Sequence, residues 1–355
     1  MNKVLFKKIK KSKPYLIAEV GVNHENSMSL AEKIIKQAKL GGADAVKFQI
    51  YKAEKIASYK SPYYWDLRKN SEKSQYKLFK KYDKFNKEDY ANLKKICQNY
   101  KLDFLATPFD LDAVNFLDKL VPFFKVASAD ITNIPLIQKV CETKKPLLIS
   151  TGGTTTKEII YIDKFIKTKF PQTELAFMHC VLSYPTEYKD ANLEIIKFLK
   201  KKFPQRLIGY SDHTIPDENM LVLSKAYELG ASIIEKHFTL DKLKGKKGND
   251  HFHSMDLNDL KKFRKNIDFI NLIRGKAETR KLISCEKISR KNARRSIVTL
   301  GKVKKNTKFT KKNLILKRPG DGISPIHFNK VLNKYARFDL EDDHKITFKD
   351  IKTKI

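Results

Sequence analysis

Eight short apolar segments alternate with helix-patterned segments over most of the chain, and each ends in polar residues. The apolar segments are 15–20, 44–49, 103–108, 123–128, 146–151, 175–180, 208–213 and 233–238. Strands that alternate with helices pair in parallel through crossover helices. Eight such units in about 230 residues predict an α/β fold of the closed (β/α)8 TIM barrel type. An open doubly wound sheet is the alternative, but no glycine-rich dinucleotide fingerprint follows the first segment.

The chain changes character after about residue 285, where short strand-like runs and turn signals replace the long helices. Residues 303–314 align weakly with residues 340–351, and each copy has a polar turn, a short strand and a threonine able to cap a helix. We therefore expect two domains, a barrel at residues 1–280 and a small pseudo-symmetric domain at residues 287–355.

The 73 basic and 40 acidic residues give a net charge of +33, which raises the question of nucleic acid binding. The lysines are spread along polar helix faces throughout the chain, so we interpret them as a solvated surface and expect no nucleic acid partner. No apolar run approaches the ~20 residues of a membrane span, and the basic N-terminus does not resemble a signal peptide. The four scattered cysteines, without a CxxC pair, favour a reducing, cytoplasmic location.

The carboxyl ends of the eight expected strands carry polar and charged residues, although such residues are poor choices for a barrel interior. In a barrel of this type the chemistry lies at those ends. A single buried lysine or histidine would more often be structural, whereas a polar residue at every strand end indicates a site. The segment 51–87 after the second strand is long enough to form a lid or substrate wall, or an oligomer contact.

Two lysines at strand ends, Lys47 and Lys125, suit an anion that carries several charges. Hydroxyl donors accompany them at Thr107, Ser128 and Ser150, and glycines follow the fifth strand at 150–153, where backbone N–H groups could approach a phosphate. No Walker loop is present, which argues against a nucleoside triphosphate. The pattern predicts phosphate binding.

Two histidines, His213 and His237, end the seventh and eighth strands, which are neighbours in a barrel. A lone histidine there would usually be a structural residue. Two imidazoles on neighbouring strand ends, with Glu19 facing them across the closed sheet, favour a site for a divalent metal.

These residues lie in motifs that resemble the sialic acid synthase (N-acetylneuraminate or nonulosonate synthase) family. The motifs occur in family order through nearly the whole chain: IAEVGVNHENS at 17–27, VKFQ at 46–49, ATPFD at 106–110, FKVASAD at 124–130, ISTGG at 149–153, HCVLSYPTE at 179–187, GYSDHT at 209–214, IIEKHFTLDK at 233–242 and KGNDHFHSMD at 247–256. The resemblance implies a barrel followed by an antifreeze-like (SAF) domain, a domain-swapped homodimer, and a reaction that needs Mn²⁺ or Mg²⁺.

The resemblance also implies an activity: condensation of phosphoenolpyruvate with an N-acetylmannosamine-like amino sugar, with release of phosphate. The C3 carbon of phosphoenolpyruvate would attack the open-chain sugar aldehyde, whose oxygen the metal polarises. Water would then add at C2, and phosphate would leave with cleavage of the C–O bond. The motifs do not distinguish N-acetylmannosamine, its 6-phosphate and di-N-acetylated 6-deoxy sugars.

The resemblance assigns roles to individual positions of this chain. Five residues would hold phosphoenolpyruvate: Lys47, Lys125, Ser128, Ser150 and Ser211. His213 and His237 would bind the metal, and Glu19 would handle a proton or a metal-bound water. Four residues would face the sugar: Gln49, Asp130, Tyr184 and Asp250. Arg318, in the KRPG sequence at 317–320, would reach the N-acyl group of the sugar in the neighbouring subunit.

This chain departs from the family pattern at two places. Asp130 stands where many members have a glutamate, so the carboxylate is one methylene shorter. An asparagine that usually precedes the Tyr-Pro pair is missing, because residues 181–183 read Val-Leu-Ser, and Ser183 is the candidate replacement.

Two other functions compete with this one. Another phosphoenolpyruvate–aldose synthase would use a similar barrel, but such enzymes lack the C-terminal domain and the KRPG sequence. A non-catalytic carbohydrate-binding protein, or a nucleic acid-binding protein that uses the +33 charge, would not need a polar residue at each strand end.

Overall fold

The computed structural model describes residues 9, 13–68, 70–243, 250–275 and 280–354. The first three residues of the motif at 247–256 therefore lie outside the described residues. The chain divides into two compact units, residues 1–275 and 276–355, and each is described here by itself. Within the described residues, no helix is long and apolar enough to cross a membrane.

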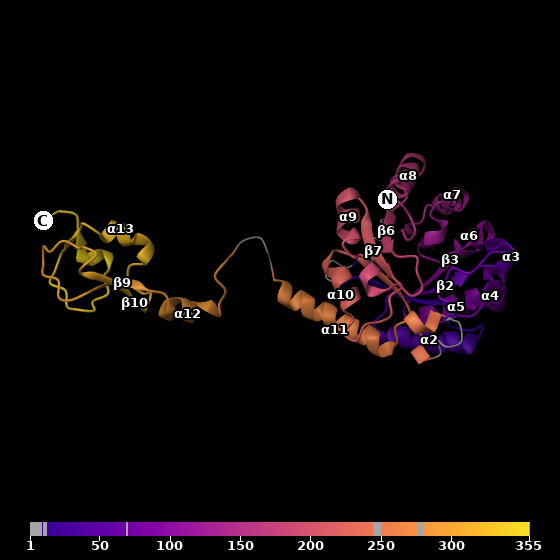
Figure 1. Cartoon of the computed structure of the whole chain (residues 1–355), viewed down its shortest axis with the longest axis horizontal. Coiled ribbons are helices and arrows are strands. Elements are labelled where there is room, and N and C mark those ends of the chain that lie inside the picture. Colours follow the sequence, from indigo (N-terminus) through magenta and orange to yellow (C-terminus); the bar gives the residue numbers. More distant parts are fainter. Residues whose placement is uncertain (1–8, 10–12, 69, 244–249, 276–279, 355) are drawn as a thin grey trace. The chain divides into compact units, whose positions relative to one another are not determined.

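The larger unit is a near-closed barrel of eight parallel strands, with helices around them (Figure 1). The strand order is β3-β2-β1-β8-β7-β6-β5-β4, and β3 and β4 at its two ends lie next to each other. The strands are β1 Tyr15–Gly21, β2 Ala45–Ile50, β3 Asp103–Pro108, β4 Phe124–Val126, β5 Leu147–Ser150, β6 Leu175–Cys180, β7 Leu207–Asp212 and β8 Ile233–His237. All eight predicted strands and the barrel fold are confirmed.

Helices connect successive strands, and most of them begin at a side-chain cap. The helices of this unit are α2 Met28–Gly41, α3 Ala53–Ile56, α4 Gln75–Tyr82, α5 Lys87–Asn99, α6 Leu111–Leu117, α7 Ile134–Glu142, α8 Thr156–Lys169, α9 Ile195–Lys202, α10 Leu221–Glu228 and α11 Leu257–Arg274. Asn86, Thr155 and Asp256 each form a capping box with a carboxylate three residues later. Helix α2 ends at Gly42, whose φ of 90° suits glycine.

Alternate residues of each strand point into the barrel, and they form an apolar layer below a polar layer. The lower layer is apolar, and it is formed by Tyr15, Ile17, Ala45, Leu105, Phe123, Leu148, Ala176, Met178 and Ile233. Two residues further along β1, β2 and β8, the same inward alternation presents Glu19, Lys47 and Glu235. The apolar layer closes the barrel from below and leaves the polar layer at its carboxyl end.

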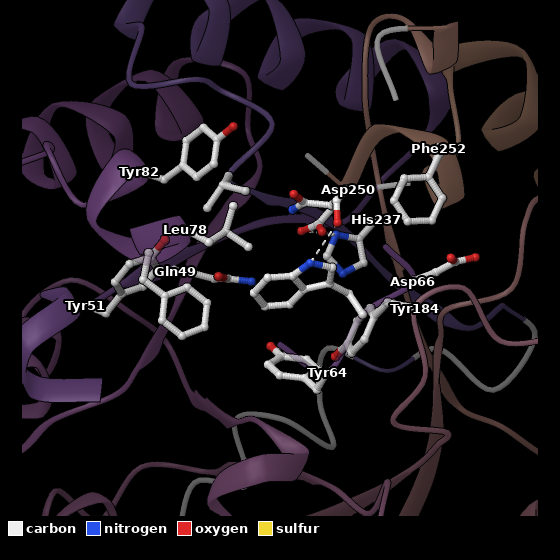
Figure 2. A pocket seen from close by; sticks show the side chains of 14 residues that line it. Gln49, Tyr51, Tyr64, Asp66, Leu78, Tyr82, Tyr184, His237, Asp250 and Phe252 are labelled. Carbon is white, nitrogen blue, oxygen red and sulfur yellow. Dashed lines mark hydrogen bonds and ion pairs between the residues drawn. The ribbon is translucent and has the colours of Figure 1, made fainter. Parts of the chain in front are cut away.

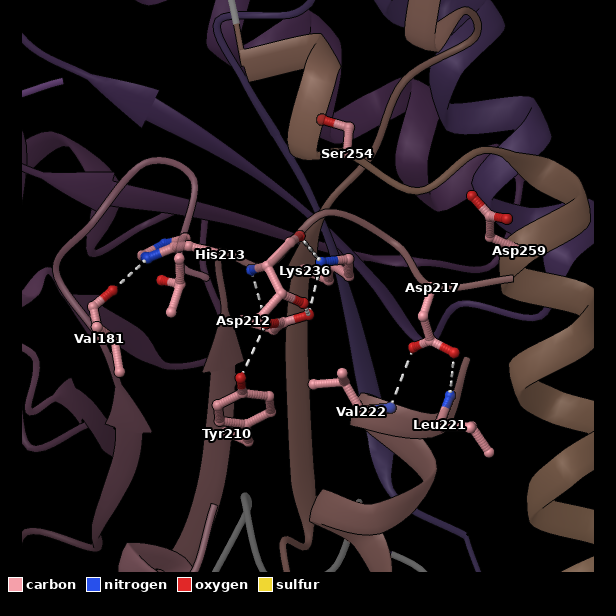
Figure 3. A network of polar contacts seen from close by, with 12 residues as sticks. Val181, Tyr210, Asp212, His213, Asp217, Leu221, Val222, Lys236, Ser254 and Asp259 are labelled. Carbon is pink, nitrogen blue, oxygen red and sulfur yellow. Dashed lines mark hydrogen bonds and ion pairs between the residues drawn. The ribbon is translucent and has the colours of Figure 1, made fainter. Parts of the chain in front are cut away.

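A buried ion pair joins the ends of β7 and β8 on the opposite side of these strands (Figure 3). Lys236 Nζ lies 2.5 Å from Asp212 Oδ2 and donates to the carbonyl oxygen of Thr214 at 2.6 Å. Asp212 also accepts from the Tyr210 hydroxyl at 2.8 Å and from the backbone N–H of Thr214 at 2.9 Å. The network fixes the two strand ends from which His213 and His237 project.

The smaller unit contains α12 Glu286–Ala293 and α13 Phe328–Val331. Its strands β9 Ser296–Thr299 and β10 Leu314–Lys317 pair antiparallel, as do β11 Tyr335–Ala336 and β12 Ile351–Lys352. The repeat seen in the sequence is visible in its contacts, since Val303 pairs with Leu340. In addition, Thr310 N donates to Asn313 Oδ1 at 2.7 Å, as Thr347 N donates to Asp350 Oδ2 at 2.8 Å.

Candidate active site

Two buried lysines and two buried carboxylates meet at the carboxyl end of the barrel. Lys47 Nζ lies 2.7 Å from Glu19 Oε2 and donates to Thr107 Oγ1 at 3.0 Å. Lys125 Nζ lies 3.2 Å from Glu235 Oε1, and Lys47 Nζ lies 3.7 Å from the same oxygen. Both lysines are at most 4% exposed, so an anion placed between them would meet two poorly hydrated cations.

Hydroxyl groups and a backbone N–H surround this cluster. Ser211 Oγ donates to Glu235 Oε1 at 3.0 Å, and the Gly152 N–H donates to Ser128 Oγ at 3.0 Å. Ser150 Oγ is buried and has no hydrogen-bond partner among the described residues, and the same holds for Glu235 Oε2. A small polyoxygen ligand could therefore find both charge and unused hydrogen-bonding groups here.

Glu235 stands at the centre of the cluster, although the sequence analysis assigned it no role. The signal was available, because Glu235 lies two residues before His237 on one strand and so must point to the same side. This signal became interpretable only once the inward face of β8 was known, because Lys236, between Glu235 and His237, is equally polar but points outward.

The two carboxylates of the cluster titrate differently. Burial raises the pKa of Glu19 to about 7, although Lys47 opposes the rise, and Glu235 adds to it. Burial acts on Glu235 in the same sense, but Lys125 and Lys47 outweigh it and hold the pKa of Glu235 below its usual value. Glu19 is thus suited to exchange a proton near neutral pH, while Glu235 stays ionised.

This difference predicts a pH-dependent contribution of Glu19 to stability. Between its unfolded pKa of about 4.5 and its folded pKa of about 7, the folded chain holds a proton that the unfolded chain releases. Stability from this group is therefore highest below about 4.5 and falls as pH rises, by at most about 1.4 kcal/mol per pH unit. We expect the unfolding free energy of the wild type minus that of Glu19→Gln to fall from pH ~5 to pH ~7, because only the wild type loses this contribution. Urea unfolding of both proteins at the two pH values measures it; a constant or rising difference would contradict the raised pKa.

Three buried imidazoles lie together beside the carboxylate–lysine cluster. His213 Nδ1 donates to the carbonyl oxygen of Val181 at 2.9 Å, so Nε2 is the nitrogen left to bind a ligand. The ring centroids of His213 and His237 are 5.6 Å apart, and those of His237 and His253 are 4.6 Å apart. One nitrogen each of His237 and His253 and one carboxylate oxygen of Asp250 lie within 4.8 Å of one another. His253 was missed by the sequence analysis.

The protonation of these histidines follows from their surroundings. Burial, with His253 and His213 nearby, holds the pKa of His237 well below its usual range. Burial also holds the pKa of His253 well below its usual range. For His213 burial acts in the same direction, but Cys180 beside it, at 3.7 Å, raises the pKa above its ordinary value. The lowered pKa values keep His237 and His253 neutral, which is the form of imidazole that binds metal ions.

A cavity of about 110 Å³ adjoins the imidazoles, and Gln49, Tyr64, Tyr184, His237 and Asp250 turn toward it (Figure 2). Gln49 Nε2 donates to Glu19 Oε1 at 3.1 Å, which links the cavity to the lysine cluster. The segment 51–87 supplies much of the wall, with Tyr51, Tyr64, Trp65, Asp66, Asn70, Leu78, Phe79 and Tyr82. It therefore lies where a substrate wall was expected.

Asp130 and Ser183 are not among the residues that line this cavity, and Arg318 belongs to the smaller unit. Asp130 ends the short 3-10 helix η1 Ser128–Asp130 and accepts from Asn133 Nδ2 at 3.0 Å. In the loop that lacks the usual asparagine, Ser183 Oγ donates to the carbonyl oxygen of Pro185 at 3.0 Å. Arg318 follows β10 in the smaller unit, where its side chain is exposed.

Comparison with known proteins identifies two family models that match this chain. Residues 34–279 match the NeuB family, and residues 294–352 match the SAF domain. The chain is 34% identical over 333 residues to N,N'-diacetyllegionaminic acid synthase of Legionella pneumophila, which covers 92% of this chain and 91% of that protein. It is 30% identical over 337 residues to N-acetylneuraminate-9-phosphate synthase of Homo sapiens, which covers 94% and 91%.

A solved structure leads to the same family. The sialic acid synthetase of Leptospira borgpetersenii, determined in complex with citrate, superposes with a TM-score of 0.67 at 32% identity. The superposition covers 78% of this chain and 90% of that one. The predicted family resemblance and the predicted SAF domain are confirmed, and the chain belongs to the NeuB family.

Proposed function

We propose that this protein is a nonulosonic (sialic-type) acid synthase, which condenses phosphoenolpyruvate with an N-acetylmannosamine-like amino sugar and releases phosphate. The observation that carries the proposal is the pair of buried lysines, Lys47 and Lys125, next to the imidazoles at the carboxyl end of the barrel. The activities named for relatives at 30% identity or more support it. We assign residues 1–280 to the synthase domain and residues 287–355 to the SAF domain, and we place the reaction in the cytoplasm.

In this proposal the lysine cluster binds phosphoenolpyruvate. The two ammonium groups neutralise its phosphate and carboxylate charges, and charge-assisted hydrogen bonds to such groups are among the strongest in proteins. The hydroxyl donors complete the site: Thr107, Ser128, Ser150 and Ser211. This assignment is supported by the burial of all four side chains at the carboxyl end of the barrel, where the lysines also lie.

A divalent cation, Mn²⁺ or Mg²⁺, would be held by His213 and His237. These residues fit a metal ion because a buried ligand atom is left without a hydrogen bond. Among the described residues His237 Nδ1 has no hydrogen-bond partner, and it lies 3.4 Å from Asp250 Oδ2. When bound, the ion supplies a Lewis acid for the carbonyl oxygen of the sugar.

The sugar would occupy the adjoining cavity. Gln49, Tyr184 and Asp250 would orient its hydroxyl and N-acyl groups. Asp130, at the end of η1, would contact the part of the sugar that extends beyond this cavity. A bond forms between C3 of phosphoenolpyruvate and the aldehyde carbon, and the aldehyde oxygen gains a proton and becomes a hydroxyl. Water then adds at C2, the C2–O bond to phosphate breaks, and phosphate leaves. Glu19, with its raised pKa, would exchange the proton.

We further propose a homodimer in which the SAF domain of one chain completes the site of the other. Arg318 is exposed, and a guanidinium suits the recognition of an N-acyl oxygen. Co-expression of Arg318→Ala with His213→Ala tests the exchange, because half of randomly paired dimers would be mixed, each with one intact site. Activity should then return to about a quarter of that of the wild type. Verified mixed dimers that remain inactive would contradict it.

The proposed function is tested by phosphate release from phosphoenolpyruvate with three sugars: N-acetylmannosamine, its 6-phosphate and a di-N-acetylated 6-deoxy sugar. We expect release with one of them. Lys125→Ala should weaken phosphoenolpyruvate binding by about 10- to 150-fold, since a hydrogen bond to a charged group contributes ~1.5–3 kcal/mol. Lys139, a lysine paired with Glu142 on helix α7, provides the matched control. Equal losses for Lys125→Ala and Lys139→Ala would count against the lysine cluster.

A further inference from the structure

His253 is a fully buried histidine whose two ring nitrogens both lack a hydrogen-bond partner in the part of the chain that the structure describes. Buried polar groups are nearly always bonded, because leaving one unpaired costs the free energy of its desolvation. The rings of Phe252 and Tyr184 lie 4.7 and 5.8 Å from that of His253. An apolar side chain would fill such surroundings without an unpaired nitrogen, so packing alone does not account for a histidine.

The position of His253 is fixed by the end of strand β8. Met255 N donates to the carbonyl oxygen of His237 at 2.7 Å, and Thr239 N donates to that of Met255 at 2.9 Å. Ser254 Oγ donates to the carbonyl oxygen of Asp250 at 2.6 Å and accepts from Asn23 Nδ2 at 3.0 Å. These contacts tie the short 3-10 helix η4, Asp250–His253, to the strand that carries His237.

The unpaired nitrogens of His253 share their surroundings with other ligand atoms. The imidazole ring lies 4.6 Å from that of His237 and 6.1 Å from that of His213. A nitrogen of His253, a nitrogen of His237 and a carboxylate oxygen of Asp250 lie within 4.8 Å of one another. Two imidazoles and one carboxylate thus offer ligand atoms to one small volume, and the ring of His213 lies beside them.

We infer that His253 is a third imidazole ligand of the metal centre, beside His213 and His237, with Asp250 as the nearest carboxylate. The inference rests on the metal site of the proposed function and extends it. A site with three nitrogen ligands favours borderline transition metals such as Co²⁺, Zn²⁺ or Fe²⁺, whereas Mg²⁺ prefers oxygen ligands. The ion that this chain retains is therefore a transition metal.

The test measures metal binding without turnover. Co²⁺ and Mg²⁺ are titrated calorimetrically into the full chain after chelator treatment, for the wild type, His253→Phe and His253→Ala. Loss of a direct ligand should weaken Co²⁺ binding by more than the ~10–100-fold that loss of an outer-shell partner costs, and should change the visible absorption of bound Co²⁺. Mg²⁺ binding should change little. An unchanged Co²⁺ affinity in both variants would overturn the inference.

His251 provides the matched control, because it is equally buried in the same short helix. Its Nδ1 lies 2.7 Å from Thr239 Oγ1 and its Nε2 lies 3.1 Å from Glu25 Oε1, so both nitrogens are engaged. His251→Gln should leave Co²⁺ affinity and absorption near those of the wild type. A loss equal to that of His253→Phe would show that the loop, rather than an imidazole, determines affinity, and would overturn the inference.

A second measurement covers the case in which the variants do not fold. Crystals of the wild type soaked in Co²⁺ should give an anomalous peak at about 2.0–2.3 Å from a nitrogen of His253. A peak bound by His213 and His237 alone overturns the inference and leaves the proposed function intact. Absence of any bound metal overturns the inference, and the phosphate-release assay then judges the synthase independently.

Discussion

Removal of divalent cations by a chelator should reduce phosphate release to background, and added Mn²⁺ should restore it. His213→Ala and His237→Ala should each have the same effect as the chelator. The reason is that both imidazoles lie buried at neighbouring strand ends, beside the cavity proposed for the sugar. Loss of an outer-shell partner typically costs ~10–100-fold in metal affinity or activity, and loss of a direct ligand should exceed that.

His179 offers a control for these substitutions. It is a buried histidine at the end of β6, but its Nε2 bonds the carbonyl oxygen of Ala191 at 2.8 Å and its ring stacks on Tyr210. His179→Asn should lose stability rather than metal dependence, so Mn²⁺ should still activate it. Full activity of the wild type after exhaustive chelation would contradict the metal site.

Replacement of Asp212 by alanine should destabilise the barrel by about 3–5 kcal/mol, a shift of roughly a hundred- to several-thousand-fold in the folding equilibrium. Asp212 and Lys236 are both within 1% of full burial, so removal of the carboxylate leaves an ammonium group without its counter-charge. The Tyr210 hydroxyl also loses its acceptor. Denaturant unfolding of the metal-free protein, followed by a signal from the barrel, measures the loss of unfolding free energy.

The double variant Asp212→Ala, Lys236→Met separates this charge effect from a packing effect. Removal of both charges should recover much of the lost stability, because apolar replacement of a buried ion pair is often nearly neutral. If the double variant is less stable than Asp212→Ala, the ion pair is not the source of the loss. A loss below ~1 kcal/mol in Asp212→Ala would contradict the assignment of an uncompensated buried charge.

The strands could be predicted from the sequence because each has a local signal, a short apolar run between turn or helix signals. The exception in length is β4, which spans only Phe124–Val126, since residues 128–130 turn into a 3-10 helix. Their position at strand ends also identified Lys47 and Lys125 as candidate site residues. Their meeting point, Glu235, depends on the closure of the barrel and on which face of β8 points inward.

Other parts of the site could not be predicted because they lie outside the regular elements. His253 ends the short 3-10 helix η4, which precedes the bridge between Phe238 and Met255, a contact that no sequence period reports. Cys180, at the end of β6, meets His213 only through the pairing of β6 with β7, which brings Cys180 Sγ to 3.7 Å from His213 Nδ1. The segment 51–87 was recognised by length alone, and its role as a cavity wall emerged only from the packing of its aromatic residues.

Condensation of phosphoenolpyruvate with an amino sugar is tested most directly by mass spectrometry of both products. The substrate carries ¹⁸O in the oxygen that bridges C2 and phosphorus. We predict one acid per phosphate released, with the mass of the sugar plus one pyruvate unit, and we predict that the label leaves with phosphate because the C2–O bond breaks. Phosphate accompanied only by free pyruvate, with no condensed acid from any of the three sugars, would contradict the proposed synthase.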